Sequence, residues 1–237
     1  MKDIILITGV SREEGLGFET AKQLVGLGHK VIITARNKDK VTQLAAKIES
    51  DAMEVDITSD QSIKELVNNF QKKYEALDVL INNAGAFFDI GTQPLDVEMD
   101  FAKQAFDTNL LGAWRMIKTF IPLIRKSKNG RIVNVSSGAG SFEDPIFGLS
   151  VHQGVVPTYG ITKLALNGLS VKLARQLKDE RIKVNSVCPG FVATYPGTVE
   201  WGARPVEEGA KGVVWAATLD ENGPTGGFFR DGKPIKW

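Results

Sequence analysis

The sequence predicts an α/β fold in which a mostly parallel, doubly wound sheet of seven strands is flanked by helices on both faces. Two observations predict it. Short apolar runs rich in Val and Ile alternate with longer amphipathic segments, which is the pattern of β-α-β units. The first run also ends in a glycine-rich turn that leads straight into a helix. Because crossovers between parallel strands are right-handed, ligands are expected at the carboxyl ends of the strands.

The individual elements follow from the periodicity of the apolar residues. Strands are expected at about 3–8, 30–34, 52–55, 78–82, 131–136, 182–187 and 227–230. Helices are expected at about 16–28, 38–49, 59–75, 97–126, 158–178 and 205–217. Nothing repeats at a fixed period, and no stretch is of low complexity. We therefore expect a single domain over residues 1–237, with substrate loops at 138–157 and 192–205.

Composition excludes several classes of partner. The 237 residues are 43% hydrophobic with a net charge of +1, and no basic run offers a patch for nucleic acid or a membrane surface. The sequence contains neither a recognisable leader nor an apolar run long enough to cross a membrane. A single cysteine, Cys188, cannot form an internal disulfide. His29 and His152 have no second ligand nearby, so no metal site is expected. These features favour a cytoplasmic protein that acts on small molecules.

The turn after the first strand has the features of a phosphate-binding loop. Gly9, Gly15 and Gly17 let the backbone turn tightly and approach a pyrophosphate, whose charge lies against the amides of the helix N-terminus. The second strand runs into Arg36, at the point where a fold that prefers NAD places a carboxylate. Arg12 adds a second cation in the loop. Because guanidinium groups suit the 2′-phosphate of the adenosine ribose, NADPH is favoured over NADH.

Two residues four positions apart on a helix supply a candidate acid. Tyr159 and Lys163 lie on one face, one turn apart. A free phenol has a pKa of about 10, but a neighbouring cation favours the phenolate and draws that pKa toward neutrality. The pair therefore suits proton transfer to or from a carbonyl oxygen. Tyr-x-x-x-Lys alone is a weak signal, because it occurs by chance in many helices.

Further blocks in a fixed order support this interpretation. The blocks are the glycine loop from Thr8 to Gly17, Val55-Asp56-Ile57, Asn82-Asn83-Ala84-Gly85, Thr108-Asn109-Leu110, Val133-Asn134-Val135-Ser136-Ser137, Tyr159-x-x-x-Lys163 and Pro189-Gly190-Phe191-Val192-Ala193-Thr194. With these blocks the chain resembles the short-chain dehydrogenase/reductase family over essentially its whole length. Among its members it is most similar to the NADPH-dependent carbonyl reductases. The resemblance implies a Rossmann-type fold.

The same resemblance implies a role for each matching position. Tyr159 would be the general acid in reduction, while Lys163 would lower its pKa and bind the nicotinamide ribose. Ser137 would hydrogen-bond the substrate oxygen and stabilise the charge that develops there. Asn109 would hold a water in a proton relay to Lys163. Ser137 is chosen over Ser136 because it is the fourth residue of the family's Asn-x-x-Ser block.

The cofactor site implied by the resemblance is built from five of these blocks. Asp56 and Ile57 would bind the adenine edge, residues 83–85 would line the adenosine side, and residues 189–194 would cover the nicotinamide. The implied positions are Gly9, Ser11, Arg12, Gly15, Leu16, Gly17, Arg36, Asp56, Ile57, Asn83, Ala84, Gly85, Tyr159, Lys163, Pro189, Gly190, Val192 and Thr194.

The glycine loop departs from the family pattern. Five residues separate Gly9 from Gly15, where the usual loop has three, and Glu13 and Glu14 add negative charge near a phosphate site. We expect the extra residues to bulge outward with both glutamates in solvent. Arg12 or a backbone amide would then face the pyrophosphate.

The segment before Tyr159 is also longer than is usual in the family. It is rich in apolar residues yet interrupted by Gly and Pro, and long loops of this kind are usually functional. We expect it to form a substrate wall with Phe87-Phe88 and the loop at 195–204, which is a candidate lid. Such a wall favours an apolar ketone or aldehyde over a sugar or a charged acid.

The predicted function is therefore NADPH-dependent reduction of a small-molecule carbonyl compound, reversible as an alcohol dehydrogenase. Two alternatives stay open: reduction of an enone double bond, and a binding protein that senses NADPH without turning it over. The complete set of Asn109, Ser137, Tyr159 and Lys163 favours an enzyme. By resemblance, the helices at 97–126 and 158–178 favour a homo-oligomer, either a dimer or a tetramer.

Overall fold

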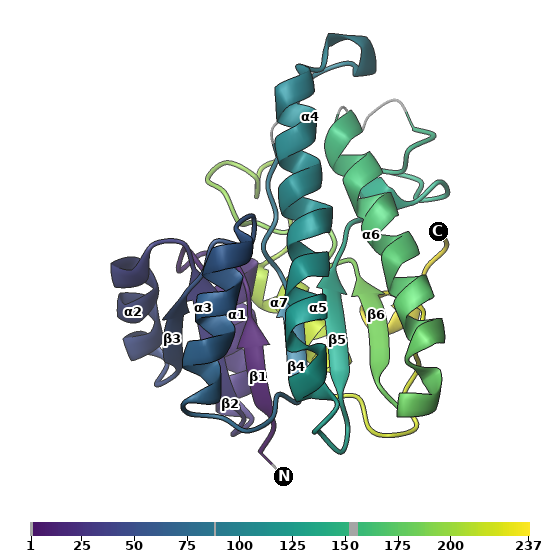
Figure 1. Cartoon of the computed structure of the whole chain (residues 1–237). Helices are drawn as coiled ribbons and strands as arrows, with labels where there is room; N and C mark the ends of the chain where they lie inside the picture. Colours follow the sequence, from purple (N-terminus) through teal and green to yellow (C-terminus); the bar gives the residue numbers. More distant parts are fainter. Residues whose placement is uncertain (1, 88, 152–155) are drawn as a thin grey trace.

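The computed structural model describes residues 2–87, 89–151 and 156–237, and within them eight strands form one sheet (Figure 1). The strand order is β3-β2-β1-β4-β5-β6-β7-β8. All neighbours from β3 to β7 are parallel, and β8 is antiparallel to β7. The strands are β1 (Ile4–Ile7), β2 (Lys30–Ala35), β3 (Asp51–Glu54), β4 (Val79–Asn82), β5 (Arg131–Val135), β6 (Lys183–Val187), β7 (Phe228–Arg230) and β8 (Lys233–Pro234).

Helices connect the strands and cover both faces of the sheet. The α-helices are α1 (Leu16–Gly26), α2 (Lys38–Lys47), α3 (Asp60–Gln71), α4 (Met99–Phe106), α5 (Ala113–Ile124), α6 (Pro157–Gln176) and α7 (Val206–Ala217). Shorter helical segments are η1 (Pro94–Asp96), η2 (Asp107–Gly112), η3 (Gly138–Gly140) and η4 (Lys178–Glu180). Figure 1 shows α3, α5 and α6 in front of the sheet, with α4 continuing the line of α5 beyond the strands.

Alternation of side chains along the strands explains the two layers of helices. On β1, Ile5 and Ile7 pack in the core beneath α1, α2 and α7, whereas Leu6 packs in the core beneath α3, α5 and α6. Both faces are apolar, as a parallel sheet with helices on each side requires. The predicted doubly wound α/β fold is confirmed. The strand order reverses between β1 and β4, which is where such sheets open a crevice for ligands.

The number of strands differs from the prediction of seven. The additional strand, β8, has only two residues, Lys233 and Pro234, which is too short to show an alternating pattern. Pro234 lacks an N–H group, so it is compatible only with an edge position such as this one.

The helix expected at 97–126 is a rod of three segments. Between α4 and α5 the backbone takes a π-helical form over Asp107–Gly112, which contains Asn109. Gly112 lies so close to Ile57 that a Cβ atom would stand 2.6 Å from its Cδ1 atom. A π-helical turn is a frequent feature of functional sites. Nothing in the amphipathic pattern of this stretch signals it.

Candidate active site

The four predicted catalytic residues come from three elements at the carboxyl edge of the sheet. Tyr159 and Lys163 lie in the first turns of α6, Ser137 directly follows β5, and Asn109 lies in η2. The Tyr159 side chain is hydrogen-bonded to that of Ser137. A Cβ atom on Gly85 would lie 3.6 Å from both the Asn109 Oδ1 atom and the Lys163 Nζ atom. The fold therefore brings all four residues into one cluster.

Burial sets the protonation of Tyr159. It raises the pKa of the phenol above its ordinary value, and the hydrogen bond with Ser137 lowers the pKa only in part. The sequence led us to expect a lowered pKa because of Lys163, but the Lys163 Nζ atom lies 5.5 Å from the centre of the phenol ring. A protonated phenol is the form that can donate a proton to a carbonyl oxygen.

Burial also changes the pKa of Lys163, because only 3% of this residue is exposed. Loss of hydration lowers the pKa of its ammonium group to about 8. The Nζ atom donates a hydrogen bond of 2.7 Å to the Val135 carbonyl oxygen, at the end of β5. This bond fixes the ammonium group at the carboxyl edge of the sheet.

The neighbouring serines face different partners. The Ser136 hydroxyl is buried and points to the carbonyl oxygen of Lys163, at 3.5 Å. Ser137 is half-buried, bonds to Tyr159 and accepts a hydrogen bond from the Ala139 N–H at 3.2 Å. This arrangement favours Ser137 as the residue that contacts a substrate oxygen.

Asn109 is fully enclosed. Its Oδ1 atom accepts a hydrogen bond of 2.7 Å from the Ala86 N–H, and its Nδ2 atom donates to the Ala86 carbonyl oxygen and to Thr162 Oγ1, both at 3.0 Å. The side chain therefore ties the chain after β4 to η2 and α6. A role as a water holder would fall to its backbone carbonyl, because these bonds engage both polar ends of the side chain.

The glycine loop is held against the end of β4. Gly9 has a φ of +74°, and a Cβ atom there would stand 2.5 Å from the Ala84 Cα atom. A Cβ atom on Gly17 would stand 2.5 Å from Asn83 Nδ2. The Thr8 hydroxyl accepts hydrogen bonds of 3.1 Å from the N–H groups of Asn83 and Ala84. Glycine is needed at both positions because the two segments touch.

The loop ends in an open helix N-terminus. Gly15 precedes α1 and has no side chain to cap its amides, which leaves the first turn accessible to an anion such as a pyrophosphate. Glu13 and Glu14 are exposed, and Glu13 pairs with Lys47 of α2. The two glutamates thus point away from the loop, as an outward bulge requires. These residues fit a dinucleotide.

Arg12 makes a contact that the sequence gave no sign of. Its Nη1 atom donates a hydrogen bond of 3.0 Å to the Thr194 carbonyl oxygen. Its guanidinium group also lies over the Tyr195 ring, 4.0 Å from the ring centre. Arg12 therefore connects the phosphate loop with the segment after β6. Two implied cofactor-binding positions lie in that segment. Gly190 has a φ of +79°, and Val192 pairs with Arg204.

The opposite end of the crevice carries Arg36 and Asp56. Arg36 is exposed after β2. Partial burial raises the pKa of Asp56, but hydrogen bonds from the N–H and hydroxyl groups of Thr58, with the nearby charge of Arg36, outweigh burial and hold that pKa below its ordinary value. An ionised acceptor and an exposed guanidinium group thus lie close together at this end of the crevice.

Aromatic and aliphatic side chains lie on the segments that were expected to form the substrate wall. The Phe87 ring stacks on the Tyr159 ring, with centres 3.9 Å apart and planes inclined by 22°. Phe147 of the long segment before α6 packs against Phe191, with ring centres 5.8 Å apart. Phe142, Ile146, Tyr195 and Trp201 are exposed. Phe88 and His152 lie outside the described residues.

Ion pairs fix the long segment before α6. Asp144 is buried and pairs with Arg230 of β7 at 2.5 Å, and Glu143 pairs with Lys236 at 2.6 Å. Both carboxylates of this segment are therefore paired within the chain.

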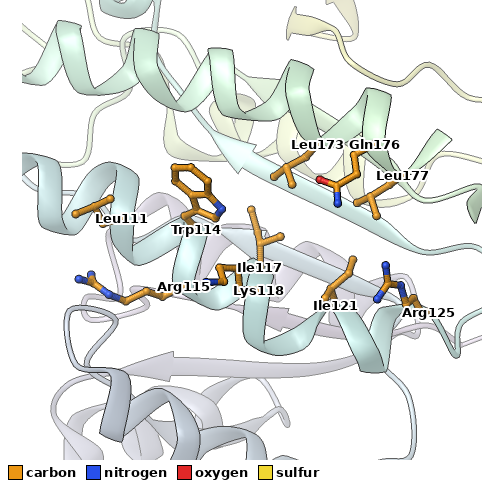
Figure 2. A pocket seen from close by; sticks show the side chains of 10 residues that line it. All are labelled: Leu111, Trp114, Arg115, Ile117, Lys118, Ile121, Arg125, Leu173, Gln176 and Leu177. Carbon is orange, nitrogen blue, oxygen red and sulfur yellow. The ribbon is translucent and has the colours of Figure 1, made fainter.

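A separate groove of about 650 Å³ lies between α5 and α6 (Figure 2). Figure 2 shows Leu173 of α6, and Leu177 just after that helix, facing Ile117 and Ile121 of α5, with the Trp114 indole between the helices. Arg115, Lys118, Arg125 and Gln176 add polar groups at its border. None of the described residues that line this groove is a predicted catalytic residue.

The described residues offer neither a metal cluster nor a membrane-spanning helix. They contain no cluster of three or more His, Cys, Asp or Glu side chains that could hold a metal ion. Among them, too, no helix combines the length and the apolar character needed to cross a membrane.

Comparison with known proteins gives a consistent result. Residues 3–200 match the family model described as short chain dehydrogenase. The chain is 34% identical to the short-chain dehydrogenase anuI of Penicillium roqueforti, over 92% of this chain and 89% of the relative. It is 29% identical to carbonyl reductase [NADPH] 1 of Mus musculus, over 100% and 99% of the two chains. A short chain dehydrogenase from Mycobacterium smegmatis has the same fold, with a TM-score of 0.81 at 20% identity, covering 97% and 91% of the two chains.

Proposed function

Because the chain belongs to the short-chain dehydrogenase family, we propose that it reduces an apolar ketone or aldehyde at the expense of NADPH, with Tyr159 as the general acid. The observation that carries this proposal is the cluster in which the buried, protonated phenol of Tyr159 bonds to Ser137 beside Lys163. The family makes the chain an oxidoreductase with a nicotinamide cofactor. The substrate, the choice of NADPH and the role of Tyr159 are our proposal.

In the proposed mechanism the cofactor supplies a hydride to the carbonyl carbon. Ser137 donates a hydrogen bond to the carbonyl oxygen and stabilises its growing negative charge. Tyr159 transfers its phenolic proton to that oxygen, and the product is an alcohol. Lys163 stabilises the phenolate that Tyr159 becomes. A proton from solvent then restores the phenol, through a relay to Lys163 that includes a water held by the Asn109 backbone carbonyl, since the Asn109 side chain is bonded to Ala86.

Three observations support NADPH as the cofactor. Arg36 stands exposed after β2, where no carboxylate side chain precedes or follows it directly. Its charge acts on Asp56, the residue that we propose binds the adenine edge, which supports a position for the guanidinium group near the adenosine. Relatives that cover the whole chain bear the name carbonyl reductase [NADPH] 1. A guanidinium group in this place suits a 2′-phosphate.

The residues proposed to form the substrate wall support the proposed substrate class. Phe87, Phe142, Ile146 and Trp201 expose apolar surface on these segments, and Asp144 of the same segments is already paired with Arg230. Such a wall gains free energy by burying an apolar substituent and offers little to a charged one.

The groove of Figure 2 supports a homo-oligomer. Exposed Leu111 and Trp114 lie beside Leu173 and Leu177 in this groove. A second copy of the chain would cover this apolar surface. We further propose a cytoplasmic location, in line with the single, buried and unpaired Cys188.

Nicotinamide absorbance with a panel of aryl ketones, aldehydes and enones tests the proposal. We expect oxidation of NADPH with a ketone or aldehyde, little oxidation of NADH, and an alcohol as product. Tyr159→Phe should abolish turnover and leave NADPH binding within about twofold, because only the hydroxyl is removed. A saturated ketone as the product of an enone would contradict carbonyl reduction. Full activity of Tyr159→Phe would contradict the assigned acid.

A further inference from the structure

The helix that carries Tyr159 begins without a cap of its own. α6 starts at Pro157, the preceding Val156 makes no side-chain hydrogen bond to the helix among the described residues, and the first turn has no acidic residue. The first N–H groups of a helix have no partner within the helix. Pro157 has no N–H group, so the first such groups in α6 belong to Thr158 and Tyr159.

A carboxylate far away in the sequence supplies this cap. The Asp89 Oδ2 atom accepts a hydrogen bond from the Thr158 N–H at 2.5 Å and lies 3.4 Å from the Tyr159 nitrogen. Only 2% of Asp89 is exposed. A negative charge buried at a helix N-terminus is stabilised by the unpaired amides and by the helix dipole. Asp89 thus takes the place of the absent N-cap side chain.

The residues just before Asp89 hold other parts of the cluster. Phe87 stacks on the phenol ring of Tyr159. Ala86 bonds through both its N–H and its carbonyl group to the Asn109 side chain. One short stretch of chain therefore binds Asn109, covers the Tyr159 ring and accepts a hydrogen bond from the Tyr159 N–H.

We propose that Asp89 is a positioning residue for Tyr159. By holding the first turn of α6, Asp89 fixes the depth of the phenol between Phe87 and Ser137, and so the distance from its proton to the substrate oxygen. An error of 1 Å in such a distance lowers a reaction rate by up to about 100-fold. This inference rests on the proposed role of Tyr159.

The experiment compares Asp89→Ala, Asp89→Asn and a control. Asn keeps a carbonyl oxygen that can accept the Thr158 N–H, and its amide nitrogen would replace Oδ1, which has no partner among the described residues. The control is Ile63→Val, which removes one methyl group from the core beneath α3 and lowers stability without touching the cluster. For each protein we would measure the melting temperature, kcat, the KM for NADPH at a saturating concentration of the carbonyl substrate, and amide exchange at Thr158 and Tyr159.

We expect Asp89→Ala to lower kcat at least tenfold, to change the KM for NADPH less than threefold, and to speed exchange of both amides. Asp89→Asn should restore most of kcat and most of the protection. Ile63→Val should have a lower melting temperature than the wild type and an unchanged kcat. An Asp89→Ala variant whose amides exchange quickly but whose kcat is unchanged would overturn the inference, since Asp89 would then only stabilise the helix.

A second measurement does not depend on turnover. The chain has three tyrosines, so NMR signals of labelled tyrosine rings can be assigned by comparison with Tyr159→Phe. Stacking on Phe87 shifts the Tyr159 signal, and we expect Asp89→Ala, but not Ile63→Val, to abolish that shift. A Tyr159 signal that is unchanged in Asp89→Ala would refute the positioning role, even if the wild type reduced no carbonyl compound. If the wild type were inactive on every substrate but Asp89→Ala still lost the shift, only the proposed function would be refuted.

Discussion

Replacement of Arg12 by Ala separates two roles for this residue. Its guanidinium group donates a hydrogen bond to the Thr194 carbonyl and lies over the Tyr195 ring. At a half-buried position the hydrogen bond contributes about 1 kcal/mol, and the cation–π contact contributes about 0.5–1 kcal/mol. Together they hold the phosphate loop against the segment that would cover the nicotinamide with about 2 kcal/mol, which corresponds to roughly a 30-fold change in a rate constant.

We therefore expect Arg12→Ala to release both NADPH and NADH roughly 30-fold faster. Stopped-flow measurement of nicotinamide fluorescence gives both dissociation rates. Tyr195→Leu, which removes only the ring contact, should speed release roughly threefold, in line with about 0.5–1 kcal/mol for that contact. Arg36→Ala is the matched control and should weaken NADPH binding alone. If Arg12→Ala weakened the binding of NADPH but not of NADH, Arg12 would contact the 2′-phosphate directly, as the sequence first suggested. The reasoning from the Thr194 contact would then be refuted.

Three further outcomes follow from the structure. The folded-state pKa of Lys163 is about 8, against an ordinary value of 10.5, so the unfolded state binds more protons above pH 8. The free energy of unfolding of the wild type, relative to Lys163→Met, should therefore rise from pH 8 to pH 10 in denaturant titrations. A difference that does not change with pH would contradict burial of the ammonium group. Deletion of Glu13 and Glu14 should raise NADPH affinity in fluorescence titrations, since both are exposed and negative; loss of binding would show that the bulge is needed. Trp114→Glu should yield a smaller particle in sedimentation, because it places a charge in the groove between α5 and α6, and a wild-type sedimentation coefficient would argue against that interface.

Local patterns were enough to predict the fold. The alternation of apolar runs placed each of β1 to β7 and α1 to α3 close to its observed bounds, because these elements bury one or two continuous apolar faces. The π-helical segment at Asp107–Gly112 could not be predicted in this way. Gly112 at its end lies against Ile57, and such a contact between elements leaves no periodic trace in the sequence.

The candidate site was predictable where its residues fall in family blocks. Ser137 was chosen over Ser136 by position in a block, and the geometry of their hydroxyl groups supports that choice. The contacts of Arg12 with Thr194 and of Asp89 with Thr158 span 182 and 69 positions. Neither pair lies on one helix face or one strand, so only the folded chain brings them together.

The direction of the Tyr159 pKa was wrong in the sequence-based prediction for a related reason. The spacing of Tyr159 and Lys163 correctly put both on one helix face, but it carried no information on desolvation. Burial raises the pKa of the phenol and lowers that of the ammonium group, and it is the largest cause of both shifts.

The pairing of Val192 with Arg204 closes the base of the loop that leads to Tyr195 and Trp201. Arg204 is in turn anchored to the Pro189 carbonyl oxygen and to the Asp231 carboxylate. The residues between 193 and 203 consequently start and finish at a fixed pair of points. Because Arg204 and not the segment itself supplies this anchorage, a protein engineer can graft a segment of another length between the two points and keep its ends in register.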